Sequence, residues 1–151
     1  MAQLKQKATE AAEQLQTAVS AAAGKNAERI IVLDVSQTLA ITDHFLICSG
    51  NSERQVHAIA DAVERGLREE WSIKPLRREG HRESRWVILD YGDFLVHAFH
   101  REERDYYDLE RLWADAPVLD LQYEENGRRS SRRSQEDELE TDESAATAEA
   151  P

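Results

Sequence analysis

The fold of this chain is indicated most clearly by residues 86–99, which read Trp86-Val-Ile-Leu-Asp-Tyr-Gly-Asp-Phe-Leu-Val-His-Ala-Phe99. Two apolar runs flank Tyr91-Gly92, where glycine can adopt the positive φ that a tight turn requires. The pattern therefore predicts a β-hairpin. Two earlier runs, residues 29–35 and 41–49, are also rich in branched apolar residues, so we expect two further buried strands.

Helical periodicity appears before, between and after these strands. Residues 4–23 carry a thin apolar stripe that ends before Gly24, which predicts a peripheral helix. Ser52 and Gln55 have the spacing of a capping box, and the helix behind them has a clean apolar stripe. We expect a last helix over residues 101–113 and a short edge strand within residues 74–78. This order of elements predicts a small α/β domain with a mixed sheet packed against helices.

The composition of the chain argues against several classes of protein. The chain has 151 residues, a single cysteine and a formal net charge of −11. One cysteine excludes a disulfide framework, and no run approaches the roughly 18 apolar residues of a membrane span. The N-terminus lacks the apolar stretch of a signal peptide, so we expect a cytoplasmic protein. The negative charge disfavours direct nucleic-acid binding and favours contact with a basic protein.

The C-terminal part of the chain differs in composition from the rest. Residues 124–151 hold nine acids and four arginines but only one large apolar residue, Leu139. Such a segment cannot bury enough surface to offset the entropy of ordering it. We therefore predict a domain over residues 1–115 and an acidic, disordered tail over residues 116–151. The basic clump at residues 128–133 leaves RNA contact open, although the overall charge disfavours it.

Four side chains in and beside the hairpin belong to types that bind metals or transfer protons. They are Asp90, Asp93, His97 and His100. The alternation of a strand places Asp93 and His97 on one face and His100 on the other, which argues against a complete cluster. We therefore predict no catalytic residue, no metal and no cofactor. The thiol of Cys48, at the end of an apolar strand, is expected to be buried and inert.

The small-residue turn after the second strand, Cys48-Ser-Gly-Asn-Ser52, is a second candidate site. Helix N-termini bind phosphate, and nucleotidyltransferases carry a Gly-Ser turn at this place. Those enzymes also need paired carboxylates to hold Mg²⁺, and no such pair follows on a strand here. The turn also lacks the spacing of a phosphate-binding loop, so we interpret it as a connection between strand and helix.

Aromatic residues are concentrated near the end of the predicted domain. Seven of the ten aromatic residues fall within residues 86–113, and acidic residues surround them. Tyrosine and tryptophan commonly anchor protein interfaces, and an acidic rim favours a partner with a basic one. Tyr91 is expected at the exposed tip of the turn. The pattern predicts a protein-binding surface.

Five stretches of the sequence occur together in a recognisable order and spacing. They are Asp34-Val35, Ile41-Thr-Asp43, Ile47-Cys-Ser-Gly-Asn-Ser-Glu-Arg-Gln-Val56, Trp86-Val-Ile-Leu-Asp-Tyr-Gly-Asp-Phe-Leu-Val-His97 and Tyr107-Asp-Leu-Glu-Arg-Leu-Trp113. In this combination the chain, to about Asp115, resembles the ribosomal silencing factor family RsfS, also called the Iojap family. The resemblance implies a nucleotidyltransferase-like fold without the catalytic carboxylates.

The resemblance also implies a function and a partner. Family members bind the large ribosomal subunit through its ribosomal protein fourteen and sterically block joining of the small subunit, which lowers translation when nutrients are short. They also form homodimers when free. By motif match, the implied partner-binding residues are Trp86, Leu89, Asp90, Tyr91, Gly92, Asp93, His97, Tyr107 and Trp113. Two alternatives remain open: a nucleotide-binding protein that uses residues 50–52, and a homodimeric adaptor with no ribosomal role.

Overall fold

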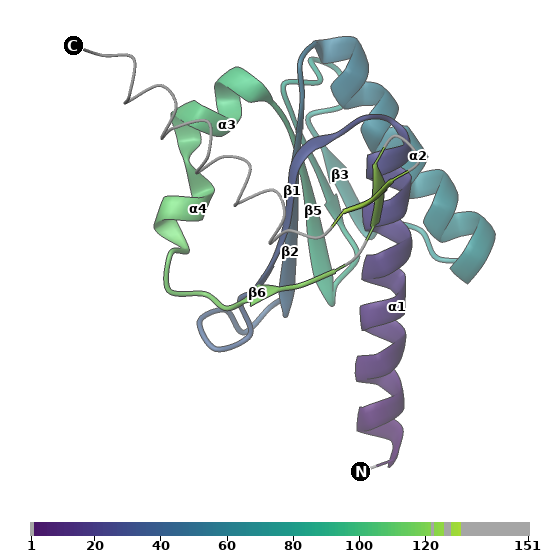
Figure 1. Ribbon diagram of the computed structural model, residues 1–151. Helices are drawn as coiled ribbons and strands as arrows, with labels where there is room; N and C mark the ends of the chain where they lie inside the picture. The colour runs from purple at the N-terminus through teal and green to yellow at the C-terminus, as the bar shows by residue number, and fades with distance from the viewer. Residues whose placement is uncertain (1, 122, 126–127, 131–151) are drawn as a thin grey trace.

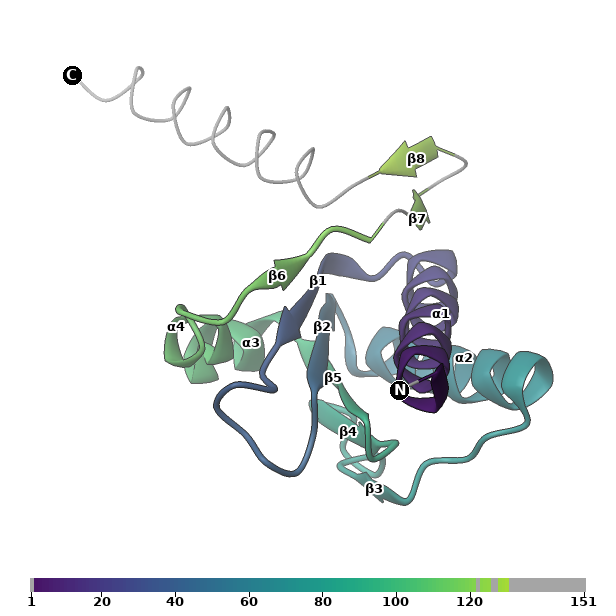
Figure 2. The same cartoon turned by 90° about the horizontal axis from the view of Figure 1, so that it is seen from below.

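The computed structural model describes the backbone of residues 2–121, 123–125 and 128–130 and the side chains of residues 9–121. A six-stranded sheet in the order β3-β4-β5-β2-β1-β6 has α1 and α2 on one face and α3 and α4 on the other (Figures 1 and 2). The elements are α1 (Ala2–Gly24), β1 (Glu28–Asp34), β2 (His44–Gly50), α2 (Glu53–Trp71), β3 (Arg77–Glu79), β4 (Trp86–Asp90), β5 (Phe94–His100), α3 (Arg101–Tyr107), α4 (Leu109–Leu112), β6 (Val118–Leu119), β7 (Tyr123–Glu125) and β8 (Arg128–Ser130).

The sheet is mixed, which confirms the predicted α/β class. Strands β2 and β5 are parallel, whereas the other neighbours in the sheet are antiparallel. The predicted hairpin is strands β4 and β5, with Trp86 opposite Phe99 and Asp90 opposite Leu95. Gly92 has a φ of 84°, as the turn requires. Strand β2 starts three residues later than predicted, and β3 lies slightly later than the predicted edge strand.

Helix α2 is held by the residues that its sequence pattern predicts. The Ser52 hydroxyl accepts a hydrogen bond from the Gln55 backbone N–H at 3.1 Å, and the Gln55 side-chain oxygen accepts one from the Asn51 N–H at 2.7 Å. The helix ends at Ser72, which has left-handed backbone angles. The buried stripe faces α1 and the sheet and contains Val56, Ile59, Ala60, Val63 and Leu67.

Helix α1 is less peripheral than its thin stripe predicts. Its C-terminal half packs against α2, and Leu15 and Val19 are fully buried in the core. Small alanines on this half allow close approach, so the helix contributes to the core despite having few large apolar residues. Its N-terminal half extends beyond the sheet (Figure 1). Within the described residues, no helix combines the length and apolar character needed to span a membrane.

The predicted last helix is in fact two short helices. Asp108 adopts left-handed angles (φ 48°, ψ 54°), which ends α3 and starts α4. Arg104 is buried at the junction, where its Nε atom lies 2.7 Å from Glu110 Oε1 and its Nη1 donates to the Glu28 carbonyl at 3.2 Å. The ion pair therefore links the two helices across the break, and the hydrogen bond anchors them to β1.

The sheet continues past residue 115, so the predicted domain boundary is too early. Val118 and Leu119 pair with β1 as strand β6, and Leu119 and Leu121 pack against the core. Strand β6 pairs with the otherwise free edge of β1. The composition of this segment does not reveal that β1 has an edge to be paired. Strands β7 and β8 form a small separate hairpin, with β7 beside α1. Disorder of the remaining tail stays a prediction, because residues 131–151 lie outside those described.

Candidate partner-binding face

Aromatic rings gather on the face of the sheet opposite α1 and α2. The Trp86 ring stacks on Phe99 with centroids 4.8 Å apart and meets Tyr107 of α3 at 4.7 Å. Phe45 contacts Trp113 at 5.4 Å in an edge-to-face arrangement, which is favourable for aromatic pairs. Alternation along β2, β4 and β5 directs these side chains to one face. We call this group the aromatic face: Phe45, Trp86, His97, Phe99, Tyr107 and Trp113.

His97 lies inside the aromatic face. Its Nδ1 atom accepts a hydrogen bond from Trp86 Nε1 at 3.1 Å, which assigns the ring proton to Nε2. Only 5% of the residue is exposed, and burial lowers its pKa from 6.5 to about 4. His97 is therefore neutral at pH 7, and its hydrogen bond holds the indole of Trp86 in place. The polar surface contact that the sequence predicts for His97 is not available in this structure.

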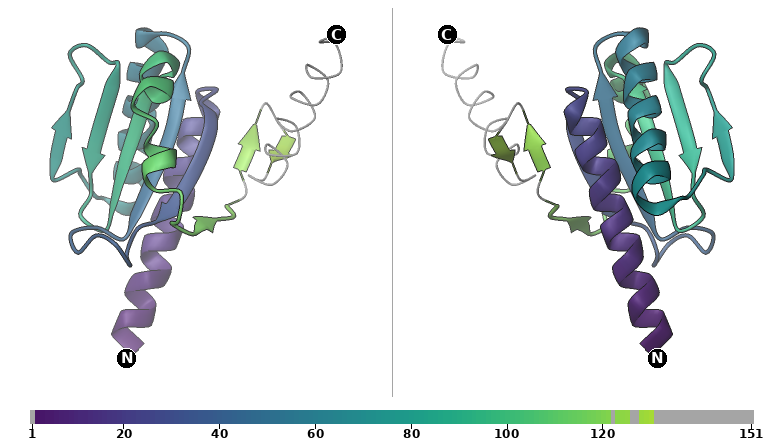
Figure 3. Two further views of the ribbon diagram at one scale, coloured as in Figure 1. Left: turned by 90° about the vertical axis from the view of Figure 1, so that its left-hand side faces the viewer. Right: turned by 90° about the vertical axis from the view of Figure 1, so that its right-hand side faces the viewer.

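The strands β3 and β4 have no helix over this face in the described part of the chain. Figure 3 shows α3 and α4 in front of the central strands, with β3 and β4 beside them. Ile88 and Leu95 lie in the strands of the hairpin on this face, yet both are only half-buried. Apolar side chains in mid-sheet are normally covered, so this part of the sheet offers apolar area to a partner.

The two short helices add exposed apolar side chains next to the rings. Tyr107 is 49% exposed although its ring contacts Trp86, and its neighbour Tyr106 is 82% exposed. Leu112 of α4 is 73% exposed, while Trp113 is half-buried. Tyr107, Trp86 and Trp113 therefore have surface available, as the sequence predicts. The sequence pattern missed Ile88, Leu95 and Leu112. Tyr106 belongs to the aromatic set that predicts a protein-binding surface but is absent from the residues implied by motif match.

The turn of the hairpin forms the far end of this surface. The Asp90 carboxylate accepts a hydrogen bond from the Gly92 N–H at 2.8 Å and lies 3.7 Å from Arg77 Nε. Asp90 therefore stabilises the turn as well as carrying charge. The Asp93 carbonyl accepts hydrogen bonds from the Asp43 and His44 N–H groups. The Asp93 carboxylate has no ion-pair partner among the described side chains.

Two predicted contact residues lie on the opposite face of the sheet. Leu89 is fully buried in the core beneath α1 and α2, so it has no surface to offer a partner. Tyr91 is half-buried, packs against the same core and stacks on Phe94 at 5.1 Å. Its predicted exposure at the turn tip is wrong, because its ring covers the end of the apolar core.

The predicted acidic rim is largely neutralised within the protein. Arg85 lies 2.8 Å from Glu102 and 2.7 Å from Glu103. Arg29 lies 2.9 Å from Asp105. Exposed pairs of this kind contribute little to stability, but they lower the charge available to a partner. Two of the six acids of the predicted rim, Asp93 and Asp108, have no ion pair with the described residues; the other four are Asp90, Glu102, Glu103 and Asp105.

The other candidate sites do not assemble. His100 caps α3 by accepting from the Glu102 N–H at 3.1 Å, so it serves a different end of the strand from Asp90 and Asp93. In the turn after β2, the Asn51 N–H donates to Gln55 and its side chain to Glu28 at 3.1 Å. The polar groups of that turn form hydrogen bonds within the fold, as expected for a connection between strand and helix. Cys48 is buried, and burial raises its thiol pKa.

The comparisons with known proteins decide the family. The model of the family "RsfS: Ribosomal silencing factor during starvation" matches residues 8–147. The chain belongs to this family. The resemblance drawn from the sequence motifs is thereby confirmed, and the match extends well past residue 115.

Individual relatives agree with this RsfS assignment. The chain is 47% identical over 110 residues to "Ribosomal silencing factor RsfS" of Halalkalibacterium halodurans, covering 73% of this chain and 93% of the relative. A crystal structure from Bacillus halodurans matches with a TM-score of 0.64 and 45% identity, covering 72% and 98% of the two chains. A mouse protein, "Mitochondrial assembly of ribosomal large subunit protein 1", is 32% identical over 91 residues, which cover 59% of this chain and 40% of that protein.

Proposed function

We propose that this RsfS-family chain represses translation by binding the large ribosomal subunit through its ribosomal protein fourteen and blocking entry of the small subunit. The action is steric and involves no chemical step. Family membership supports a silencing role at the ribosome, and the mouse relative's name refers to assembly of the large subunit. The protein acts in the cytoplasm under nutrient limitation, where fewer joined ribosomes mean less translation.

The observation that carries the proposal is the apolar strip left open on the sheet. It runs from Asp93 at the turn, over Leu95 and Ile88, to Trp86 and Tyr107. Rigid aromatic rings at one end provide anchor area at low entropic cost. The unpaired carboxylate of Asp93 at the other end suits a lysine or arginine of a basic ribosomal protein. Leu89, Tyr91 and His97 act in this proposal as support from within the fold.

The test is co-sedimentation in a sucrose gradient with separated large and small subunits, followed by joining. The chain should sediment with the large subunit and reduce the fraction of joined ribosomes. Tyr107→Ala should weaken this binding by about 1–3 kcal/mol, the usual range for an interface anchor. Arg65→Ala, on the exposed side of α2, is the matched control and should bind like the unchanged protein.

A binding assay with purified ribosomal protein fourteen tests whether this protein, and not another part of the large subunit, makes the contact. Tyr107→Ala should weaken both interactions by the same factor. If the chain remains at the top of the gradient at low salt, the ribosomal role fails. If it binds the subunit but not ribosomal protein fourteen, the proposed contact is wrong. Self-association through the same face predicts that ribosomal protein fourteen and a second copy compete, which light scattering of the mixtures would measure.

A further inference from the structure

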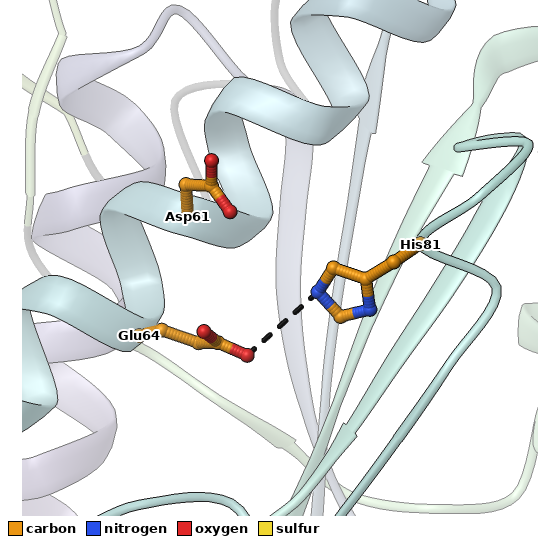
Figure 4. Close-up of side chains that lie close together, drawn as sticks. All are labelled: Asp61, Glu64 and His81. Carbon is orange, nitrogen blue, oxygen red and sulfur yellow. Dashed lines mark ion pairs between the residues drawn. The ribbon is translucent and has the colours of Figure 1, made fainter.

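A cluster of metal-ligating side chains lies on the other side of the molecule from the aromatic face. It comprises Asp61 and Glu64 of α2 and His81 of the β3–β4 connection (Figure 4). Their candidate ligand atoms all lie within 4.8 Å of one another. Asp61 and Glu64 are three residues apart, which places both carboxylates on one side of the helix. In Figure 4 the His81 ring points across the gap toward this side of α2.

Two polar atoms of the cluster are buried without hydrogen bonds. Glu64 Oε1 and His81 Nε2 are inaccessible to solvent and form no hydrogen bond with any described residue. Glu64 Oε1 forms an ion pair with Arg78 Nε at 3.1 Å and lies 3.7 Å from His81 Nε2. The Tyr91 hydroxyl is likewise buried and unbonded, and burial and then the Glu64 carboxylate raise its pKa. Such buried groups are costly unless something satisfies them.

The backbone around His81 is held in place by the fold. The Ser84 N–H donates to the Gly80 carbonyl at 2.9 Å, and the Ser84 hydroxyl donates to the His81 carbonyl at 2.8 Å. Gly80 has a φ of 84°, and a Cβ there would lie 1.9 Å from the Trp86 carbonyl oxygen. The imidazole is thus carried by a tight loop of defined geometry. Preformed geometry of this kind lowers the cost of binding a ligand.

A fourth side chain, His57, positions Asp61, the most exposed residue of the cluster. His57 Nε2 lies 3.2 Å from Asp61 Oδ2, one helical turn away, and His57 Nδ1 lies 3.4 Å from the Ser84 hydroxyl. A histidine next to a ligating carboxylate orients it, as supporting groups in metal sites commonly do. Arg78, which is 55% exposed at its side chain, is free to move into solvent when a cation takes the Glu64 oxygen.

The chemistry of the set selects the class of ion. One imidazole nitrogen with two carboxylates suits zinc and related transition ions, whereas Mg²⁺ and Ca²⁺ prefer all-oxygen sites. Ligand atoms around tetrahedral zinc lie about 3.3 Å apart, given bonds of about 2.0–2.1 Å. Closing the cluster therefore requires a shift of at most roughly 1.5 Å, which the exposed Asp61 side chain can supply by a rotation.

We propose that Asp61, Glu64 and His81 form a Zn²⁺-type binding site that links α2 to the β3–β4 connection. The ion replaces the ion pair between Glu64 and Arg78 and satisfies the buried atoms of Glu64 and His81. The site lies on the α2 side of the sheet, so zinc and the ribosomal partner occupy separate surfaces. This inference does not depend on the proposed function.

The experiment titrates tag-free, full-length protein with Zn²⁺ against a chromophoric chelator. One equivalent should bind, and a hundredfold excess of Mg²⁺ should not displace it. His81→Ala should weaken binding by at least the roughly tenfold effect typical of losing a supporting group. His44→Gln, which changes a histidine of β2 that is not part of the cluster, is the matched control and should bind normally. Zinc at about 100 times its Kd should raise the Tm by roughly 5–10 °C, and at the same zinc concentration His81→Ala should reduce this rise to about half or less.

Far-UV circular dichroism of the metal-free variants shows whether each is folded. If His81→Ala does not fold, Asp61→Asn takes its place, because Asp61 is exposed and its loss leaves the core intact. Absence of zinc binding overturns the proposal. So does binding that folded His81→Ala or Asp61→Asn leaves unchanged, since zinc would then lie elsewhere on the chain. Displacement by Mg²⁺ would overturn the assignment to a zinc-type ion.

Discussion

The burial of His97 makes the stability of this protein sensitive to mild acid. The residue has a pKa of about 4 in the folded chain, against 6.5 when unfolded. The unfolded chain therefore binds more protons between these values, and stability rises with pH through that window. The contribution is fully present above pH 6.5 and is lost as the pH falls toward 4.

The size of the effect follows from the two pKa values. Each pKa unit corresponds to about 1.4 kcal/mol, so the neutral, buried ring contributes about 3 kcal/mol that disappears at low pH. Of this, about 2 kcal/mol should be lost between pH 7 and pH 5. That loss is a large share of the total stability of a small domain.

Urea unfolding followed by far-UV circular dichroism at pH 7 and pH 5 measures this loss. His97→Gln retains a side-chain oxygen that can accept a hydrogen bond from Trp86 Nε1, but this side chain does not titrate. Between pH 7 and pH 5 its free energy of unfolding should therefore fall by about 2 kcal/mol less than that of the unchanged protein. The carboxylates titrate in both proteins, so the difference between the two cancels their contribution. If unchanged protein and His97→Gln lose equal stability from pH 7 to pH 5, the argument from burial is refuted.

Three further changes test packing contacts in other parts of the fold, each by urea unfolding. Glu110→Ala should lower the free energy of unfolding by about 2–4 kcal/mol, because it leaves buried Arg104 without its carboxylate; an effect below 0.5 kcal/mol would show that Arg104 finds another partner. Gly80→Ala should cost at least about 2 kcal/mol, because its Cβ meets the Trp86 carbonyl, whereas Gly24→Ala, in open space, should be nearly neutral. Tyr91→Ala should cost about 1–2 kcal/mol of stability yet leave binding to the large subunit unchanged, and a binding defect in folded protein would return Tyr91 to the contact surface.

Much of the fold could be predicted because its signals are local. The apolar stripe of α2 and its cap at Ser52 are properties of a few consecutive residues, and the structure confirms both. The hairpin is likewise set by its alternation and by Gly92. The broken last helix could not be predicted, since its residues are compatible with one continuous helix. The break at Asp108 is stabilised by the distant contact of Arg104 with β1.

The candidate site was predicted in part for a related reason. Trp86, Tyr107 and Trp113 were chosen by residue type, and the structure gives all three some exposed surface on one face. The same criterion could not distinguish Leu89 and Tyr91, which face the core, from residues on the open face. Side chains of a hairpin alternate between the two faces of the sheet, and the sequence does not say which face the helices cover. Ile88 and Leu95 were missed because apolar residues in a strand normally indicate core.

The sequence by itself therefore determined most of the elements, their order and the family, because periodicity, turn residues and spaced motifs are properties of residues close together in the chain. Tertiary structure decided which face of the hairpin stays open, and it neutralised most of the acidic rim through Arg85 and Arg29. It also brought His81 to Glu64 across the gap between the β3–β4 connection and α2. These outcomes depend on contacts between residues far apart in sequence, which only the packed sheet and helices bring within reach of one another.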